Sequence, residues 1–409
     1  MNELEPARPV RAAAAIGRGA VWEDAAAAAL SSIARQLDGG EADVAFLFAS
    51  SEYLRDFPAL LARVRGALPT RVLAGCSGQA VIGGGRELEG EPAVALLAVS
   101  LPGASWHAAW ITQSDLELAR GAAGWHERTG VPAGQARAWF LFADPFSVDG
   151  DALLEAISGA YPGVPVVGGL ASGDYRLQRT QLFLNDRVYE RGAVALALGG
   201  AYTLRTVVSQ GCTPIGEPWI ITAAAGQIVE AIAGRPAYKV LLETVTALPP
   251  EVRARARGNL FVGLVVDERR ETLRRGDFLI RNLIGVDPDR GAIVVGAQPR
   301  AGQTLQFQIR DRAAADEDLA ALLDGAHSGL GSAAPVAGLL CVCNGRGAGL
   351  FGSPDHDAAA VAGRFGSLPL AGFFCNGEFG PVGPRNFVHG YTASLALIVP
   401  DAPDGIHPS

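Results

Sequence analysis

One pattern recurs three times along this chain, and it limits the folds that the chain can adopt. In each copy, an apolar strand is followed by a stretch of helix length, by a second apolar strand that runs into a glycine-centred turn, and by a third apolar strand. The three turns are RVLAGCSG (71–78), VPVVGGLASG (164–173) and LPLAGFFCNG (368–377). A unit that recurs at near-constant spacing indicates a duplicated module, and alternating strands and helices indicate an α/β fold.

The spacing inside the copies supports the same interpretation. The first strand and the turn are 27, 26 and 29 positions apart, measured from Phe48 to Gly75, Phe142 to Gly168 and Cys343 to Gly372. We therefore predict that segments 43–102, 136–200 and 333–400 superpose as one unit. The strand VAFLFAS (44–50) lacks polar alternation, so both of its faces should be covered. The predicted fold class is α/β, with duplicated strand–helix–strand–strand units forming mixed sheets covered by helices, in two related domains.

The length of the chain predicts more than one domain, because 409 residues exceed one ordinary hydrophobic core. Arg235-Pro236 has the character of a hinge, and we place the boundary there. The first helix is expected over residues 22–37, which are rich in alanine. The expected parts are an N-terminal tail with the start of the first helix (1–29), a first domain (30–235), a second domain (236–400) and a C-terminal tail (401–409).

Charge and cysteine usage exclude several kinds of partner. The net charge of −8 argues against nucleic acid or an anionic membrane surface. No apolar leader follows Met1, and no apolar run approaches the ~18 residues that span a bilayer. The five cysteines are odd in number and lack C-x-x-C spacing, which is typical of reduced thiols in a cytoplasm. We expect a cytoplasmic protein without disulfides or metal, and a single lysine and methionine indicate a GC-rich bacterial genome.

The segment CNGRG (343–347) carries the strongest cluster of functional residue types. Asn344 and two glycines permit unusual backbone angles that bring amide N–H groups to a surface. Arg346 would then offer a planar fork to a carboxylate or a phosphate. The alternative is a local ion pair between Arg346 and Asp355 or Asp357.

The segment CNGEFGPVG (375–383) is the second cluster, because three glycines and a proline fix a shaped loop. Glu378 inside this loop would bind a ligand amine, or it would accept backbone N–H groups and tie the turn. Asn376 lies beside it. Cys375 is either a nucleophile, if a base lies nearby, or a buried core thiol.

The remaining polar candidates end apolar strands or precede them. Arg281 and Arg310 each close such a strand, where they face a pocket or form structural ion pairs. His389 and His356 are the histidines that would serve as haem ligands, although neither lies in a metal-binding motif. The chain has neither a Walker A motif nor the G-x-G-x-x-G spacing of a dinucleotide site.

Taken in order, these motifs resemble the FIST family, the two-part sensory module of F-box and intracellular signal-transduction proteins. The matching stretches of the C-terminal part are RGNLFVGLVVD, GDFLIRNLIGVDP, LQFQIRDRAAADEDL, CNGRGAGLFG, LAGFFCNGEFGPVG and FVHGYTASLAL. Those of the N-terminal part are ADVAFLFAS, RVLAGCSG, VPVVGGLASG and CTPIGEPWIIT. The resemblance covers roughly residues 30–400.

The resemblance implies an N-terminal and a C-terminal FIST domain that together bind a small ligand, with amino acids as the suggested class. In bacteria such modules sit beside histidine kinases, cyclic-dinucleotide enzymes or chemoreceptors, and some members are haem-binding sensors of nitric oxide. In eukaryotes the module is the substrate receptor of an F-box ubiquitin ligase. We expect that no residues of this chain remain for an output domain, so that it signals through a separate partner protein or acts alone.

The resulting hypothesis is a non-enzymatic sensory protein that binds an amino acid or a similar small metabolite. Arg346 would hold the ligand carboxylate and Glu378 its amine. The residues expected to face the ligand are Arg346, Asn344, Glu378, Asn376, Arg281 and Arg310. Three alternatives stay open: a haem-based nitric-oxide sensor that uses His389 or His356, a Cys375-dependent enzyme, and a structural interaction module that binds no ligand. We expect no bound haem.

Overall fold

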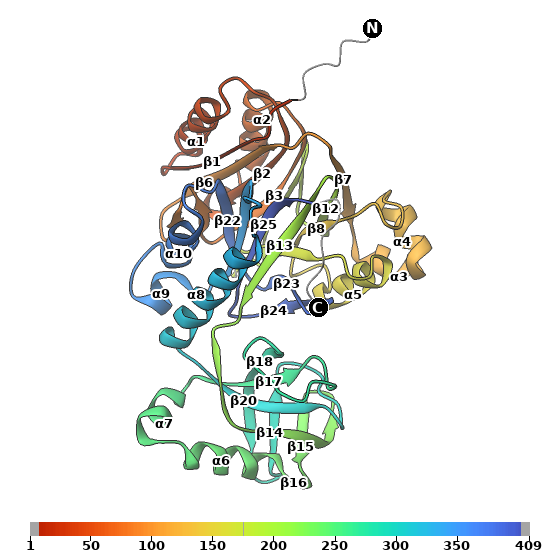
Figure 1. Ribbon diagram of the computed structural model, residues 1–409, viewed down its shortest axis with the longest axis vertical. Coiled ribbons are helices and arrows are strands. Elements are labelled where there is room, and N and C mark those ends of the chain that lie inside the picture. The colour runs from red at the N-terminus through yellow and green to blue at the C-terminus, as the bar shows by residue number, and fades with distance from the viewer. Residues whose placement is uncertain (1–7, 175, 402–409) are drawn as a thin grey trace. The chain divides into compact units, whose positions relative to one another are not determined.

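The computed structural model describes residues 8–174 and 176–401 (Figure 1). The chain divides into two compact units, which we describe separately. Unit 1 combines the residues up to 208 with those from 322 onward, and unit 2 comprises residues 209–321. This division differs from the sequence-based boundary at residue 235, because the strands of segment 333–400 pair with strands from the N-terminal half.

Unit 1 contains three copies of one element order. The first copy consists of β1 (Arg11–Arg18), α1 (Trp22–Leu37), β2 (Ala42–Ser50), a 3-10 turn (Ser51–Tyr53), α2 (Phe57–Ala67), β3 (Thr70–Gly78), β4 (Val81–Gly83), β5 (Arg86–Leu88) and β6 (Ala93–Ser100). The second consists of β7 (Ala104–Ile111), α3 (Gln113–Leu118), α4 (Gly121–Thr129), β8 (Ala138–Ala143), α5 (Gly150–Ala160), β9 (Val166–Leu170), β10 (Leu182–Leu184), β11 (Arg187–Tyr189) and β12 (Ala193–Gly200).

The third copy begins with β13 (Tyr202–Ser209) and resumes within α8 (Arg312–Gly329), since unit 2 ends at residue 321. It continues through β21 (Ala337–Cys343), α9 (Gly347–Phe351), α10 (His356–Phe365), β22 (Leu370–Cys375), β23 (Glu378–Val382), β24 (Arg385–His389) and β25 (Ala393–Pro400). Helix α1 is found where the sequence predicts it. Strand β1 was not predicted. It lies in the segment assigned to the N-terminal tail, and it pairs with β6. Residues 1–7 and 402–409 of the two expected tails lie outside the described residues.

The sheet topology places the strands of the three segments at equivalent positions, as the sequence-based repeat predicts. Each copy builds one six-stranded sheet, with the orders β1-β6-β2-β3-β10-β11, β7-β12-β8-β9-β23-β24 and β13-β25-β21-β22-β4-β5. Strands β2, β8 and β21 each lie between one antiparallel and one parallel neighbour. The predicted α/β class with mixed sheets is therefore correct.

A hairpin exchange joins the copies in a closed cycle, and nothing in the sequence analysis predicted it. The hairpin β4–β5 of the first copy extends the third sheet, β10–β11 of the second extends the first, and β23–β24 of the third extends the second. Each sheet is thus completed by another copy. No copy of unit 1 forms its full sheet from its own strands.

Glycines set the register of the central parallel pairs. Gly75, Gly168 and Gly372 lie opposite Leu47, Leu141 and Leu340, respectively. A Cβ added at these glycines would lie 1.8, 2.0 and 1.7 Å from the carbonyl oxygen of the paired leucine. This register corrects one detail of the sequence-based repeat, because Cys341, and not Cys343, corresponds to Phe48 and Phe142.

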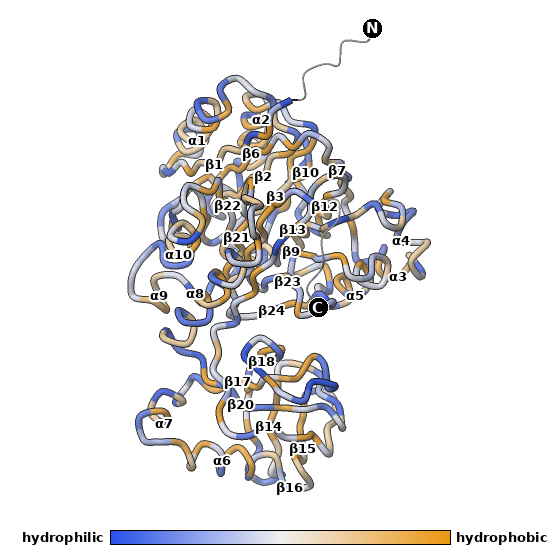
Figure 2. The backbone as a smooth tube through the Cα atoms, viewed as in Figure 1, coloured by the Kyte–Doolittle hydropathy of each residue, from blue (hydrophilic) through white to orange (hydrophobic). Residues whose placement is uncertain are grey.

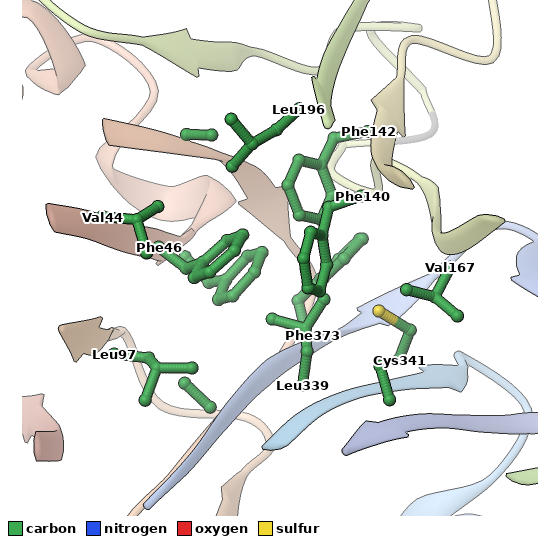
Figure 3. Packing of buried hydrophobic residues seen from close by; sticks show 14 of the residues in the cluster. Val44, Phe46, Leu97, Phe140, Phe142, Val167, Leu196, Leu339, Cys341 and Phe373 are labelled. Carbon is green, nitrogen blue, oxygen red and sulfur yellow. The ribbon is translucent and has the colours of Figure 1, made fainter. Parts of the chain in front are cut away.

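The apolar core of unit 1 is formed by side chains from all three sheets. Figure 3 shows phenylalanines from the first, second and third copies pointing toward one another. The Phe46 and Phe140 ring centroids are 5.0 Å apart, and Phe48 stacks on Phe373, also at 5.0 Å. Figure 2 shows the same apolar character along the backbone of the central strands. The uninterrupted apolar strands are therefore covered on both faces, as predicted, with α1 and α2 packed on the other face of the first sheet.

Unit 2 is built around a seven-stranded sheet with its own core. Its elements are β14 (Cys212–Ala225), β15 (Ile228–Ile232), β16 (Arg235–Pro236), α6 (Ala237–Ala247), α7 (Pro250–Ala256), β17 (Leu260–Val265), β18 (Phe278–Asp287), β19 (Ala292–Val295) and β20 (Thr304–Arg310). The strand order is β14-β20-β17-β18-β19-β15-β16, and an additional β14–β15 pairing closes six of the strands into a ring. Phe307, Val262 and Ile293 lie in its buried core.

The glycine register generates a stability prediction. Gly372→Ala should destabilise the protein by about 1–3 kcal/mol or more, because the new methyl group overlaps the Leu340 carbonyl and the strands must move apart. The matched control is Gly363→Ala in α10, where a Cβ meets nothing within 4 Å and alanine favours the helix. Urea unfolding of both variants measures the difference. Equal midpoints would contradict this account of the register.

Candidate functional site

The loops that follow β21 and β22 lie side by side at the same edge of the third sheet. The two strands are parallel, and Cys343 is in register with Cys375. The Asn344 amide N–H donates to the Cys375 carbonyl at 3.0 Å, and Asn344 Nδ2 donates to Asn376 Oδ1 at 2.8 Å. The carboxyl ends of strands at such an edge are the usual place for ligands in α/β sheets.

Turns from the other copies meet these loops. Asn376 donates through its backbone N–H to the Leu170 carbonyl at 3.0 Å and through Nδ2 to the Ala171 carbonyl at 3.1 Å. Ser172 Oγ donates to the Phe374 carbonyl and accepts from the Gln79 N–H at 2.7 Å. The three glycine-centred turns that the sequence analysis singled out are thus joined by direct hydrogen bonds.

Arg346 is buried, and its guanidinium forms a bidentate ion pair. Nε and Nη2 donate to the two carboxylate oxygens of Asp357 at 2.6 and 2.8 Å, and the guanidinium lies 5.2 Å from the centroid of the Phe351 ring. The local ion pair considered in the sequence analysis is therefore present, with Asp357 as the partner. The third nitrogen, Nη1, has no hydrogen-bond partner within the described part of the chain.

Electrostatics hold this pair in its charged form. Burial raises the pKa of the Asp357 carboxyl, but the Arg346 charge and its hydrogen bonds lower it to about 2 overall. Burial lowers the pKa of Arg346, and the attraction of Asp357 outweighs this effect and raises it. Smaller contributions to Arg346 come from Glu378 and Cys343. His356 Nδ1 lies 3.0 Å from Asp357 Oδ1, and its ring stacks on Phe351.

Two acidic residues of this site come from the first copy and were missed by the sequence analysis. Glu87 on β5 is buried, and its Oε1 accepts the Ala358 N–H at 2.8 Å in the first turn of α10. Glu89 accepts the Ala348 N–H at 2.8 Å. Both reach the third copy through the exchanged hairpin β4–β5. No local sequence signal could have found them, because only this exchange brings them to Arg346 and Asp357.

Glu87 is a buried acid beside another acid. Burial, followed by the charge of Asp357, raises the pKa of Glu87 from 4.5 to about 8. Oε2 of Glu87 has no hydrogen-bond partner within the described residues. Glu87 therefore stays protonated at neutral pH and adds no further negative charge beside Asp357.

Glu378 lies at the start of β23 and is fully buried. Its Oε2 accepts the Thr392 N–H at 3.0 Å, so it ties the turn, as one of the two readings of the sequence predicts. Across the hairpin it is paired with His389, whose Nε2 lies 3.0 Å from the Gly380 carbonyl oxygen. The Glu378 charge also contributes to the field at Arg346.

The other two predicted ligand residues belong to unit 2. Arg281 lies on β18 opposite Val262, and its Nη1 donates to the Ile280 carbonyl at 3.0 Å. Arg310 ends β20, where its backbone N–H donates to the Asn259 carbonyl. The structure thus brings four of the six predicted residues together in unit 1, namely Arg346, Asn344, Asn376 and Glu378.

All five cysteines are free of disulfides. Burial raises the pKa of the Cys375 thiol well above its ordinary range, with a further contribution from a hydrogen bond to Cys341. Because the thiolate is the nucleophilic form, Cys375 has the properties of a core thiol. Cys343 differs from the other four in being only partly buried. Within the described residues, no cluster of three or more His, Cys, Asp or Glu could hold a metal ion.

Two family models together match most of the chain. The FIST N domain model matches residues 43–235, and the FIST C domain model matches residues 237–381. The chain belongs to the FIST family. FIST domains are sensory domains of signal transduction proteins. No helix in the described part of this FIST protein is long and apolar enough to cross a membrane.

Relatives of this FIST protein occur in mycobacteria. It is 41% identical over 376 residues to the uncharacterised protein Rv0628c of Mycobacterium tuberculosis, covering 92% of this chain and 96% of that one. It is 38% identical over 367 residues to Mb0898c of Mycobacterium bovis, covering 90% and 93%. Among solved structures, cyanuric acid hydrolase from A. caulinodans aligns with 96% of this chain and 99% of its own at 10% identity and a TM-score of 0.37. Nothing about function follows from that likeness.

The buried carboxyl of Glu87 generates a pH prediction. Between pH 4.5 and about 8 the unfolded chain releases this proton while the folded protein keeps it, so the free energy of unfolding falls as pH rises through that window. Glu87→Gln keeps the acceptor for the Ala358 N–H and removes the titration. We expect the variant to lose this slope and to gain stability on the order of 3 kcal/mol at pH 8 relative to wild type.

Urea unfolding at half-unit intervals from pH 5 to 9 measures this effect. The window excludes the titration of Asp357, whose pKa is about 2. Glu117→Gln at an exposed position of α3 is the matched control and should keep the wild-type slope. Parallel curves for wild type and Glu87→Gln would show that the folded protein does not retain a proton on Glu87.

Proposed function

We propose that this FIST protein is a sensor that binds a small amphoteric metabolite, such as an amino acid, at the loops after β21 and β22. The proposal rests on one observation. Asn344 Oδ1 and Arg346 Nη1 are a buried acceptor and a buried donor, two residues apart, and neither has a hydrogen-bond partner in the described part of the structure. Such atoms are few in native proteins, and each costs about 1–3 kcal/mol.

The chemistry of these two atoms favours a ligand that carries both an amine and a carboxylate. Asn344 Oδ1 accepts from an ammonium group, and Arg346 Nη1 donates to a carboxylate. Because Asp357 already occupies Nε and Nη2, Arg346 offers one nitrogen to the ligand and not the bidentate fork that the sequence analysis expected. A contact through one arginine nitrogen selects the ligand by its charge and size, because it does not fix the geometry of the carboxylate as a bidentate contact would.

The neighbouring residues position the contacting groups. Asn376 Oδ1 accepts a hydrogen bond from Asn344 Nδ2. This bond fixes the orientation of the Asn344 side-chain amide and therefore of its Oδ1. Glu378 adds negative potential near the site without leaving its bond to the Thr392 N–H. The bound ligand would satisfy groups on the loops of both strands, so occupancy would stabilise the edge of the third sheet.

The signal would pass by contact with a separate protein, such as a histidine kinase or a cyclic-dinucleotide enzyme. The proposal assigns no catalytic residue and no haem. It places the protein in the cytoplasm, because five free thiols are maintained in a reducing compartment.

Thermal shift followed by calorimetric titration, with the twenty amino acids as probes, tests the site. At least one should raise the melting temperature, and Asn344→Ala should weaken its binding tenfold or more, which is about 1.4 kcal/mol. The matched control is Gln79→Ala, since Gln79 takes the place of Asn376 in the first copy and donates to the Gly173 carbonyl at 3.2 Å. Equal affinities for Asn344→Ala and wild type would place the ligand elsewhere, and no shift with any probe would exclude amino acids.

A further inference from the structure

We propose that Cys343 is a peroxide-reactive thiol, which hydrogen peroxide or a small organic hydroperoxide oxidises to a sulfenic acid at the base of the Asn344–Gly347 loop. This activity goes beyond the binding of a metabolite. It requires no ligand at the site described above.

Cys343 occupies a position that the other copies use for the fold. It lies three residues after Leu340, just as Ser50 follows Leu47 and Asp144 follows Leu141. In the first two copies the side chain at this position is buried and holds a neighbouring segment. Ser50 Oγ accepts the Ala93 N–H at 2.9 Å, and Asp144 Oδ1 accepts from Thr180 at 2.6 Å. The third copy has a partly exposed thiol there.

One hydrogen-bond donor and one charged group act on the sulfur. The Gly345 N–H donates to Cys343 Sγ at 3.5 Å. The Arg346 guanidinium is 1% exposed, interacts electrostatically with Cys343, and has a nitrogen, Nη1, without a partner among the described residues. The Gly345 N–H and the Arg346 charge favour the thiolate, which is the nucleophilic form of cysteine, while the Asp357 and Glu378 charges near Arg346 act against it. Thiolate character combined with access to solvent is the setting in which cysteines become oxidised.

The oxidation of Cys343 by a peroxide is a two-electron step. The thiolate sulfur attacks one oxygen of the peroxide, an S–O bond forms, and the O–O bond breaks. The leaving hydroxide takes a proton from solvent and departs as water; from an organic hydroperoxide the leaving group is an alkoxide, which departs as an alcohol. Sulfur loses two electrons and the peroxide gains them. Arg346 Nη1 is then available to donate to the new oxygen, because Asp357 engages only the other two nitrogens.

The remaining cysteines serve as internal controls. Cys375 is in register with Cys343 on the neighbouring strand, but it is fully buried, and burial raises the pKa of its thiol well above the ordinary range. Cys76, Cys212 and Cys341 are buried as well. We therefore expect one reactive thiol out of five.

The experiment treats the full-length protein with one equivalent of hydrogen peroxide at pH 7 and traps sulfenic acid with dimedone, followed by peptide mass spectrometry. A single adduct on Cys343 is expected in wild type and, to the same extent, in Cys375→Ser, and none in Cys343→Ser. Trapping on a different cysteine, or no trapping while the protein stays folded, would overturn the proposal.

The role of Arg346 is measured separately. Alkylation of Cys343 by iodoacetamide at pH 7 should be at least tenfold faster than that of glutathione, and Arg346→Gln should remove this advantage while Arg346→Lys retains most of it. If Arg346→Gln does not fold, the pH dependence of the alkylation rate of wild-type Cys343 tests the proposal. A rate that is level from pH 6.5 to 9 supports a stabilised thiolate, and a tenfold rise per pH unit would refute it. None of these measurements depends on a ligand, so they remain valid if the metabolite proposal fails.

Discussion

The close approach of three glycines to the opposing backbone is the constraint on which unit 1 depends. Any side chain at Gly75, Gly168 or Gly372 would overlap the carbonyl group of a paired leucine. The glycines therefore allow each parallel pair to form in only one register, and the register decides which residues end the two strands together. In the third copy it places Cys343 beside Cys375, so that Asn344 and Asn376 can bond.

The hairpin exchange makes the site a property of the whole unit. The first copy supplies Glu87, while the third supplies Arg346 and Asp357. A buried ion pair gains little net stability, but loss of one partner leaves an uncompensated charge that costs about 3–5 kcal/mol. A proton on Glu87 keeps that balance, since a second carboxylate beside Asp357 would compete for one guanidinium. The hydrogen bond from the Ala358 N–H to Glu87 holds the exchanged hairpin against α10. The position of the hairpin therefore affects the electrostatics around Arg346.

The features that local sequence patterns encode could be predicted from the sequence. The three repeats, helix α1 at Trp22–Leu37 and the pairing of the two strand-end loops all follow from apolar runs and glycine-rich turns. The hairpin exchange could not be predicted, because β4, β5 and β10 have only three residues each and carry no periodic signal. For the same reason Glu87 was missed. Arg346 illustrates a second limit, since its sequence neighbourhood permits both a ligand clamp and an ion pair, and only packing decides that Asp357 holds two of its nitrogens.

Departure from internal symmetry is the strongest indication of where function lies. Ser50, Asp144 and Cys343 occupy equivalent positions at or just after the ends of β2, β8 and β21, and the serine and the aspartate hold neighbouring segments by hydrogen bonds. The third copy has a thiol instead. Near it in sequence are Asn344 Oδ1 and Arg346 Nη1, two buried atoms without a hydrogen-bond partner among the described residues. Buried polar atoms without hydrogen-bond partners lower stability. Local conflict of this kind persists where a site is selected for chemistry, because a sequence under selection for stability alone would remove it.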